Sequence, residues 1–105
     1  MDENFDISVE ELKALLGSGE KIHLIDVREE YEFEADNLGG HLIPLGEIPD
    51  RIDELEALKG QEIYLHCRSG ARSGNAKNYL ISQGFNKVHN VIGGILAYRA
   101  MEAQS

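Results

Sequence analysis

Cysteine is almost absent from this sequence: Cys67 is the only one among 105 residues. One cysteine cannot close an intramolecular disulfide and cannot supply a cysteine-rich zinc or iron–sulfur site. The four histidines show no spacing typical of metal ligands, so we expect no metal and no other cofactor, and we expect structural histidines whose ring nitrogens have partners. Cys67 is therefore inert, intermolecular or reactive.

Long apolar runs are also missing. They span only a few residues, far short of the roughly 20 that cross a bilayer, and Met1 to Phe5 lack the basic residues of a secretory leader. We therefore expect a cytoplasmic protein without a membrane partner, and we expect a monomer. No linker or repeat divides the chain, and its length suits one domain, residues 1–105, with one core.

Acidic residues are missing from residues 63–101, which hold five Lys or Arg. Residues 2–62, in contrast, hold 18 Asp or Glu against five Lys or Arg, and the net charge is −9. The basic segment is too small, and the whole chain too acidic, for a nucleic-acid partner. A small anionic substrate fits this charge distribution better. The acidic stretch 29–36 is interpreted as a solvated helix face.

Short β-branched segments alternate with amphipathic ones along the chain. The pattern predicts strands at 22–27, 63–67 and 87–91, a brief extended segment at 42–45, and helices at 8–17, 29–35, 48–58, 73–83 and 95–101. This alternation predicts an α/β domain, with a small open and mostly parallel β-sheet that carries helices on both faces.

Cys67 lies where a core strand ends and a loop of small residues leads into a helix. In such sheets, ligands bind beyond the carboxyl ends of the strands. A loop of this kind can turn its backbone N–H groups towards the sulfur and favour the thiolate, with Arg68 and Arg72 adding to the effect. Alternatively, Cys67 is a small buried apolar residue and the arginines are solvated. His66 is expected to face away from the sulfur.

Several segments together resemble the rhodanese-homology family of single-domain sulfurtransferases, over roughly residues 6–100. The matching segments are Ile25-Asp26-Val27-Arg28-Glu29, Ile43-Pro44-Leu45, the loop His66-Cys67-Arg68-Ser69-Gly70-Ala71-Arg72-Ser73, Gly84-Phe85, and Val91-Ile92-Gly93-Gly94-Ile95. The resemblance implies a rhodanese-like fold. It also implies that the family's cysteine accepts a sulfane sulfur from a donor such as thiosulfate and passes it to a thiol, to cyanide or to a protein acceptor.

Residue roles follow from the resemblance. Cys67 would be the catalytic nucleophile that forms a persulfide. The substrate-binding loop would comprise Arg68, Ser69, Gly70, Ala71 and Arg72, with both arginines as contacts to a small anionic sulfur donor. Asp26 and Arg28 would support the site as an ion pair or through hydrogen bonds, and Ser73 would support it at the end of the loop.

Two other functions stay open at this point. The chain could be a persulfide carrier or interaction module without turnover, which binds a partner through its acidic front segment. A phosphatase or arsenate reductase is the weaker alternative, because cysteine phosphatases have a Cys-x5-Arg loop. Here the arginine follows Cys67 after four residues, and Ser73 stands where the phosphatase arginine would fall. The smaller loop suits one sulfur atom.

Overall fold

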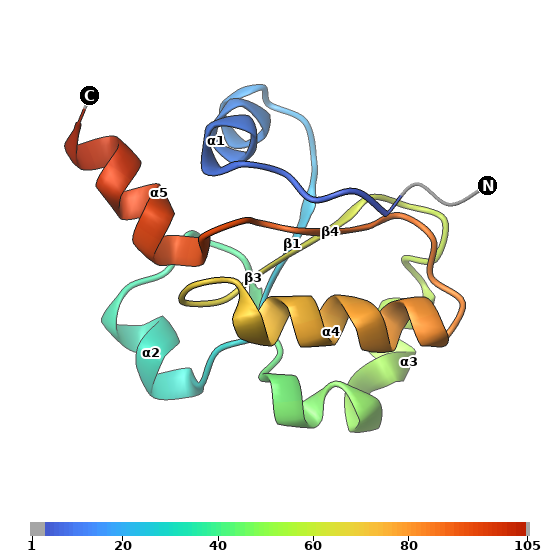
Figure 1. The fold of residues 1–105 in the computed structure, drawn as a ribbon. Helices are drawn as coiled ribbons and strands as arrows, with labels where there is room; N and C mark the ends of the chain where they lie inside the picture. The colour runs from blue at the N-terminus through green and yellow to red at the C-terminus, as the bar shows by residue number, and fades with distance from the viewer. Residues whose placement is uncertain (1–3, 105) are drawn as a thin grey trace.

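The computed structural model describes residues 4–104, and its helices and strands alternate along the chain as predicted (Figure 1). The strands are β1 (His23–Asp26), β2 (His41–Leu42), β3 (Ile63–His66) and β4 (Val88–Asn90). The helices are α1 (Val9–Gly17), α2 (Glu30–Ala35), α3 (Ile52–Glu56), α4 (Ala71–Ser82) and α5 (Gly94–Ala103), with short 3-10 helices at Leu45–Glu47 and Pro49–Arg51.

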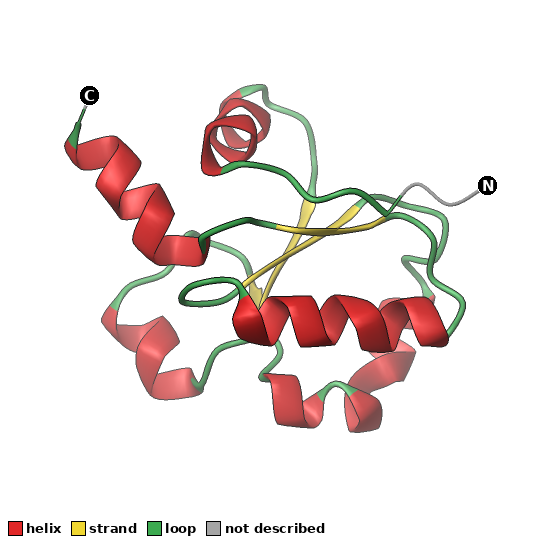
Figure 2. Ribbon diagram, in the orientation of Figure 1, coloured by secondary structure: helices red, strands yellow, loops and turns green. Residues whose placement is uncertain are grey.

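The four strands form one parallel sheet in the order β2-β1-β3-β4. Helices cover both faces, which confirms the predicted fold class (Figure 2). Asp26, the last residue of β1, pairs in register with His66, the last residue of β3. Because all strands run in the same direction, their carboxyl ends meet at one edge of the sheet, next to Cys67.

Alternating side chains of β1 and β3 fill two separate apolar layers. Ile25 and Leu65 point into the layer under α3 and α4, where Cys67 also lies, together with Leu55 and Leu80. In a strand, neighbouring side chains point to opposite faces. Cys67 therefore belongs to the α3/α4 side of the sheet.

The second layer lies between the sheet and the pair α1 and α5. Leu24 and Tyr64 contribute to it from the strands, Leu12 from α1 and Tyr98 from α5. His66 is two residues after Tyr64, so its ring belongs to this side of the sheet, away from the sulfur as predicted.

Several element boundaries differ from the predicted ones. Helix α4 begins at Ala71 rather than at residue 73, because Gly70 has φ of +109° and its carbonyl accepts the first helical hydrogen bond, from the Gly74 N–H. The extended segment predicted at 42–45 pairs only over His41–Leu42, and the helix predicted at 48–58 is split into a 3-10 turn and α3. Helix α1 begins as expected, with a capping box between Ser8 and Glu11.

Residues 4–104 contain neither a membrane-spanning helix nor a cluster of metal-binding side chains. None of the helices there has the length and apolar content that crossing a bilayer requires. Over the same residues, no group of three or more His, Cys, Asp or Glu side chains is placed to bind a metal ion.

Candidate active site

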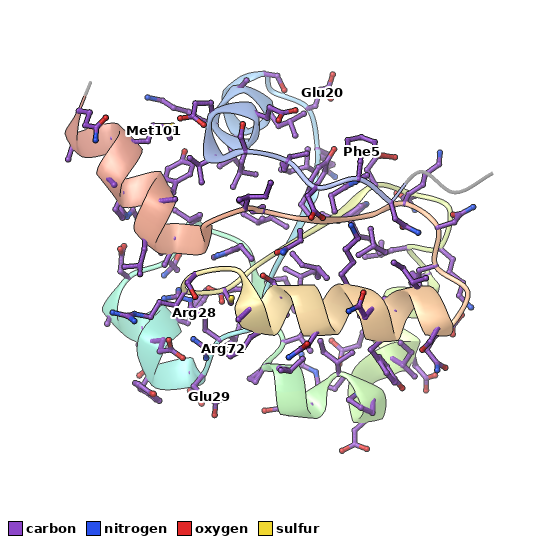
Figure 3. All side chains as sticks on the ribbon, viewed as in Figure 1. Phe5, Glu20, Arg28, Glu29, Arg72 and Met101 are labelled. Carbon is purple, nitrogen blue, oxygen red and sulfur yellow. The ribbon has the colours of Figure 1, made fainter. Side chains whose placement is uncertain are left out.

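Cys67 follows β3 directly and is buried, with 1% of its surface exposed. The loop that follows it is short, because α4 already begins at Ala71. Arg28, Glu29 and Arg72 gather at this end of the sheet, near the start of α4 (Figure 3). The sulfur therefore lies at the edge of the sheet where the sequence predicts a site.

Hydrogen-bond donors surround the sulfur. The Gly70 N–H donates to Sγ at 3.1 Å and the Ser73 hydroxyl lies 3.4 Å from it. Burial alone would raise the pKa of the Cys67 thiol, but hydrogen bonds from the Ser73 hydroxyl and from the N–H groups of Ser73, Gly70 and Ser69 outweigh it. The pKa of Cys67 is consequently below its ordinary value, and the thiolate, which is the nucleophilic form, is favoured.

Two carbonyl groups at the start of the loop are bound by the first turn of α5. The Ile95 N–H donates to the Cys67 carbonyl at 3.0 Å, and the Leu96 N–H donates to the Arg68 carbonyl at 3.1 Å. N–H groups in the first turn of a helix have no partner inside the helix, so α5 can offer them to the loop. Helix α5 thereby holds the loop in a conformation whose N–H groups face Sγ.

Ser73 and Asn90 tie the loop to β4. The Ser73 Oγ lies within hydrogen-bond distance of three acceptors: Sγ, the Gly70 carbonyl at 3.3 Å and the Asn90 Oδ1. The Asn90 Nδ2 donates to the Gly70 carbonyl at 3.2 Å. A hydroxyl has one proton, which Ser73 can donate either to the Asn90 Oδ1 or to Sγ, and an ionised Sγ is the charged acceptor of the two. Ser73 is therefore placed to stabilise the thiolate once it forms. Asn90, which was not predicted as a site residue, fixes the Gly70 carbonyl and accepts from Ser73 when Cys67 is protonated.

Replacing Ser73 with alanine should raise the pKa of Cys67, because a donor to the charged form is lost while burial stays. At neutral pH the rate of alkylation by iodoacetamide should fall by about 3-fold or more, and the midpoint of its pH profile should move upward. Ser82→Ala is the matched control, since Ser82 lies at the far end of α4 and is exposed. An unchanged midpoint in Ser73→Ala would contradict this role.

Arg72 does not point into open solvent but pairs with α2. Its Nη1 and Nη2 donate to the two carboxylate oxygens of Glu32 at 2.7 and 2.9 Å. The hydrogen bond from Arg72 lowers the pKa of Glu32 to about 2. Glu32 was assigned to a solvated helix face, and that assignment is wrong, since only 14% of its side chain is exposed. A solvated and a paired glutamate have the same sequence pattern.

Arg68 is the other arginine of the loop, and it is exposed. Among residues 4–104, no carboxylate forms an ion pair with its guanidinium. The two arginines, which were predicted to have the same role, are thus different. Arg68 has a charge available to a ligand, whereas the charge of Arg72 is balanced by Glu32.

Asp26 and Arg28 form a buried ion pair, with 0% and 4% of their surfaces exposed. The Arg28 Nη2 lies 2.7 Å from the Asp26 Oδ2, and the Arg28 backbone N–H donates to Oδ1 at 3.0 Å. Arg28 also donates to the carbonyl of Asp36, which follows α2, at 2.7 Å. The pair therefore fixes the turn after β1 and the position of α2, which carries Glu32.

His66 departs from the expectation that every histidine ring has a partner. Its ring is fully buried, neither ring nitrogen has a hydrogen-bond partner, and Nε2 lies 3.6 Å from the Asp26 Oδ2. Burial lowers the pKa of His66, and the nearby Asp26 only partly opposes this effect. His23, His41 and His89 do have partners, at 2.9, 3.4 and 2.7 Å from Gln61, Glu54 and Glu62.

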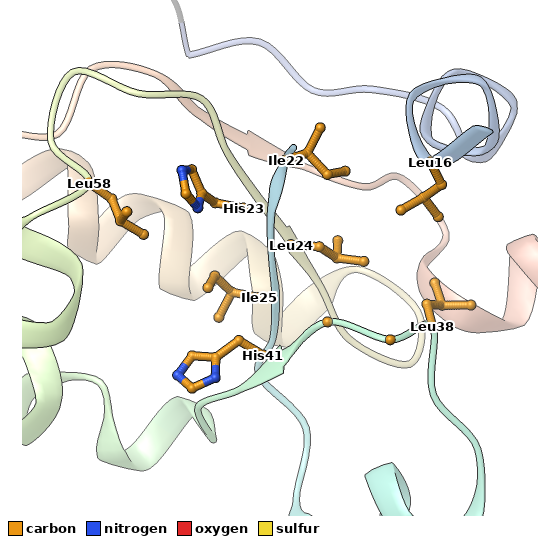
Figure 4. A pocket seen from close by; sticks show the side chains of 10 residues that line it. Leu16, Ile22, His23, Leu24, Ile25, Leu38, His41 and Leu58 are labelled. Atoms are coloured by element: carbon orange, nitrogen blue, oxygen red, sulfur yellow. The ribbon is translucent and has the colours of Figure 1, made fainter. Parts of the chain in front are cut away.

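A separate pocket lies beside β1 and the short strand β2, away from the Cys67 loop (Figure 4). Its lining is mostly apolar and consists of Leu16, Ile22, His23, Leu24, Ile25, Leu38, Gly39, Gly40, His41 and Leu58. Its lining contains two histidines but no Cys, Ser, Thr, Lys, Arg, Asp or Glu. The chemistry-bearing residues are gathered at Cys67 instead.

Comparison with known proteins identifies the family. The model of the rhodanese-like domain matches residues 8–101, nearly the whole chain. This chain belongs to the rhodanese-like family. The resemblance of its motifs to that family is therefore confirmed.

Two relatives of this rhodanese-like chain have names that refer to sulfur. The "Putative sulfur carrier protein YrkF" of Bacillus subtilis (strain 168) is 42% identical over 86% of the chain and 48% of its own length. The "Putative sulfurtransferase YtwF" of the same organism is 39% identical over 89% of the chain and 88% of its own length. The chain thus spans about half of one relative and most of the other.

Solved structures agree with the family. The human single-domain sulfurtransferase TSTD1 superposes with a TM-score of 0.74 at 26% identity, covering 95% of this chain and 97% of that one. The match extends over both chains almost entirely, so the rhodanese-like fold described here is that of a known sulfurtransferase.

Proposed function

We propose that this protein is a sulfurtransferase that carries a sulfane sulfur as a persulfide on Cys67. The observation that carries the proposal is the set of donors around Sγ: the Gly70 N–H at 3.1 Å and the Ser73 hydroxyl at 3.4 Å. These donors favour the thiolate, which is the nucleophile the reaction needs. The names of YtwF and TSTD1 support the same activity.

The reaction has two steps. The Cys67 thiolate attacks the outer sulfur of a donor such as thiosulfate, the S–S bond of the donor breaks, and sulfite leaves with the bonding electron pair. The N–H groups of the loop then stabilise the negative charge of the persulfide. In the second step, a thiolate or cyanide attacks the outer sulfur and releases the Cys67 thiolate. Because Cys67 is the only cysteine of the sequence, the acceptor lies outside these 105 residues.

The size of the loop favours sulfur transfer over phosphatase or arsenate chemistry. The Gly70 N–H is already within 3.1 Å of Sγ, so the loop closes around the sulfur itself. Arg72, the arginine nearest to the position that a phosphatase would use, is held by Glu32. The site therefore fits one added sulfur atom better than a tetrahedral oxyanion.

An intact-mass measurement tests the proposal. After incubation with thiosulfate and removal of the excess donor, the protein should gain the mass of one sulfur atom, and peptide mapping should place it on Cys67. Treatment with cyanide should remove the added mass, because cyanide takes the outer sulfur. The absence of an adduct at any donor concentration would refute a Cys67 persulfide.

A persulfide carrier is the second candidate, favoured by the name of YrkF and by the exposed residues Glu30 and Glu34 on α2. A carrier would form a stable adduct, show negligible turnover with small acceptors, and hold a protein partner that is lost when the exposed Glu30 and Glu34 are neutralised. Turnover with a small thiol would instead favour the enzyme. We also propose a cytoplasmic location, where thiols stay reduced.

A further inference from the structure

The ion pair between Glu32 and Arg72 has a fixed geometry. The two terminal guanidinium nitrogens of Arg72, Nη1 and Nη2, donate to the two carboxylate oxygens of Glu32, at 2.7 and 2.9 Å. The Glu32 side chain is also fixed within α2, because its Oε1 accepts a hydrogen bond from the Glu29 N–H at 3.0 Å in the capping box. Paired planar groups of this kind are oriented as well as attracted. The pair therefore presents no net charge to a molecule that approaches Cys67.

The charge that stays unpaired on α2 and on the Cys67 loop is mainly negative. Helix α2 lies beside the loop before α4 (Figure 1), and Glu29, Glu30 and Glu34 are exposed on it or at its start. Among the described residues, no basic side chain forms an ion pair with these three carboxylates. Arg68 is the free cation of the loop. On α2 and the loop together, one arginine with an available charge stands against three exposed carboxylates.

Resting on the persulfide chemistry proposed above, we infer that Glu32 selects sulfur donors by charge. By neutralising Arg72, it disfavours dianionic donors such as thiosulfate and favours donors with one negative charge or none, such as organic thiosulfonates and persulfides. Glu32 does not touch the reacting sulfur. It acts through Arg72 and is a specificity-determining residue. The charge of Arg72 is balanced by Glu32, so Arg72 does not bind the donor in the wild-type protein.

The substitution Glu32→Gln removes the charge of the Glu32 side chain but keeps its shape. Glutamine keeps a side-chain oxygen that can accept the Glu29 N–H, and capping boxes accept glutamine at this position. It can also accept one hydrogen bond from Arg72, but it no longer balances the charge. The substitution thus frees a positive charge beside the site while α2 stays in place.

Two donors that differ by one charge report the effect. Thiosulfate is a dianion, and methanethiosulfonate is a monoanion that loses its outer sulfur to Cys67 as methanesulfinate leaves with the electron pair. Interaction with a freed Arg72 scales with donor charge, so the rate gain for the dianion should be the square of that for the monoanion. We expect a gain of about 5-fold for methanethiosulfonate and about 25-fold for thiosulfate at low salt.

The ratio of the two second-order rates of persulfide formation, measured by intact mass, is the readout. Any change in the pKa or reactivity of Cys67 affects both donors and cancels in this ratio. Glu54→Gln is the matched control, because Glu54 is also paired with an arginine through two oxygens, at 2.7 and 3.0 Å from Arg51, in a pair that no hydrogen bond joins to the Cys67 loop. The control should leave the ratio unchanged.

The double variant Glu32→Gln/Arg72→Gln should return the ratio to the wild-type value, because both charges are then gone. A ratio that stays high would show that a displaced α2, and not Arg72, causes the gain, and would overturn the inference. A second test uses the wild-type protein alone. Added salt should speed the reaction of thiosulfate more than that of methanethiosulfonate. The opposite salt effect would also overturn it.

The failure of this inference differs from the failure of the proposed function. If both donors form the persulfide and the ratio is the same in wild type and Glu32→Gln, charge selection by Glu32 is wrong while the sulfur transfer stands. If neither donor forms the persulfide, the proposed function fails and the inference falls with it.

Discussion

Cys67→Ser is expected to lose sulfur transfer completely. The serine oxygen can accept the same hydrogen bonds from Gly70 and Ser73, so the loop should keep its shape. A serine hydroxyl, however, is not ionised near neutral pH and forms no persulfide. The rate of transfer from a sulfane donor to cyanide should therefore fall by at least about 1000-fold, to the rate without protein.

Two measurements check this result. Intact-mass spectra after incubation with the donor should show no added sulfur in the variant, and urea unfolding should show a native-like midpoint, so that the loss is chemical. Transfer within about 10-fold of the wild-type rate would mean that another group carries the sulfur or that the donor reacts directly with the acceptor.

Gly94→Ala is expected to have the largest effect on stability. A Cβ at Gly94 would lie 2.4 Å from the Cys67 carbonyl oxygen and 2.6 Å from that of Arg68, and Gly94 has φ of +59°. The added methyl group would therefore push α5 away from the loop whose carbonyls it binds. We expect the free energy of unfolding to fall by roughly 3 kcal/mol, through strain together with the lost contacts.

Gly39→Ala serves as the control for the cost of placing alanine in the left-handed backbone conformation. Gly39 has φ of +85°, but nothing lies within 4 Å of its ideal Cβ, so only the left-handed conformation is penalised, by about 1 kcal/mol. The difference between the two variants in the free energy of unfolding, obtained by urea denaturation, measures the cost of the clash between the added Cβ and the loop carbonyls. Gly94→Ala should also slow the alkylation of Cys67, because the N–H groups lose their orientation; equal effects of both substitutions would contradict the close approach.

Local patterns were enough to predict most of the fold. The β-branched segments at 22–27 and 63–67 and the capping box at Ser8 depend on neighbouring residues, and β1, β3 and α1 occur where these patterns indicate. The start of α4 was missed because Ala71 and Arg72 look like loop residues in sequence. The Gly70 carbonyl accepts a hydrogen bond from the Gly74 N–H, and only this contact shows that the helix has already begun.

The candidate site was less predictable where it depends on distant residues. Cys67 could be found from its place after a strand, and the loop composition indicated an N–H cradle. Glu32 is 40 residues from Arg72 in sequence, and Asn90 is 20 residues from Gly70. Nothing in the acidic stretch distinguishes a carboxylate that meets an arginine from one that faces water. Such pairs follow from the packing of α2 and β4 around the loop.

The binding of the Cys67 and Arg68 carbonyls by α5 has a consequence for biosynthesis. The N–H groups of Ile95 and Leu96, and the side chain of Asn90, belong to residues that the ribosome adds after the whole loop has been made. Until then, the hydrogen bonds that α5 and Asn90 make to the loop carbonyls cannot form, so the loop is held only by contacts within residues 67–74. We therefore expect Cys67 to reach its full reactivity only after α5 has docked on the loop.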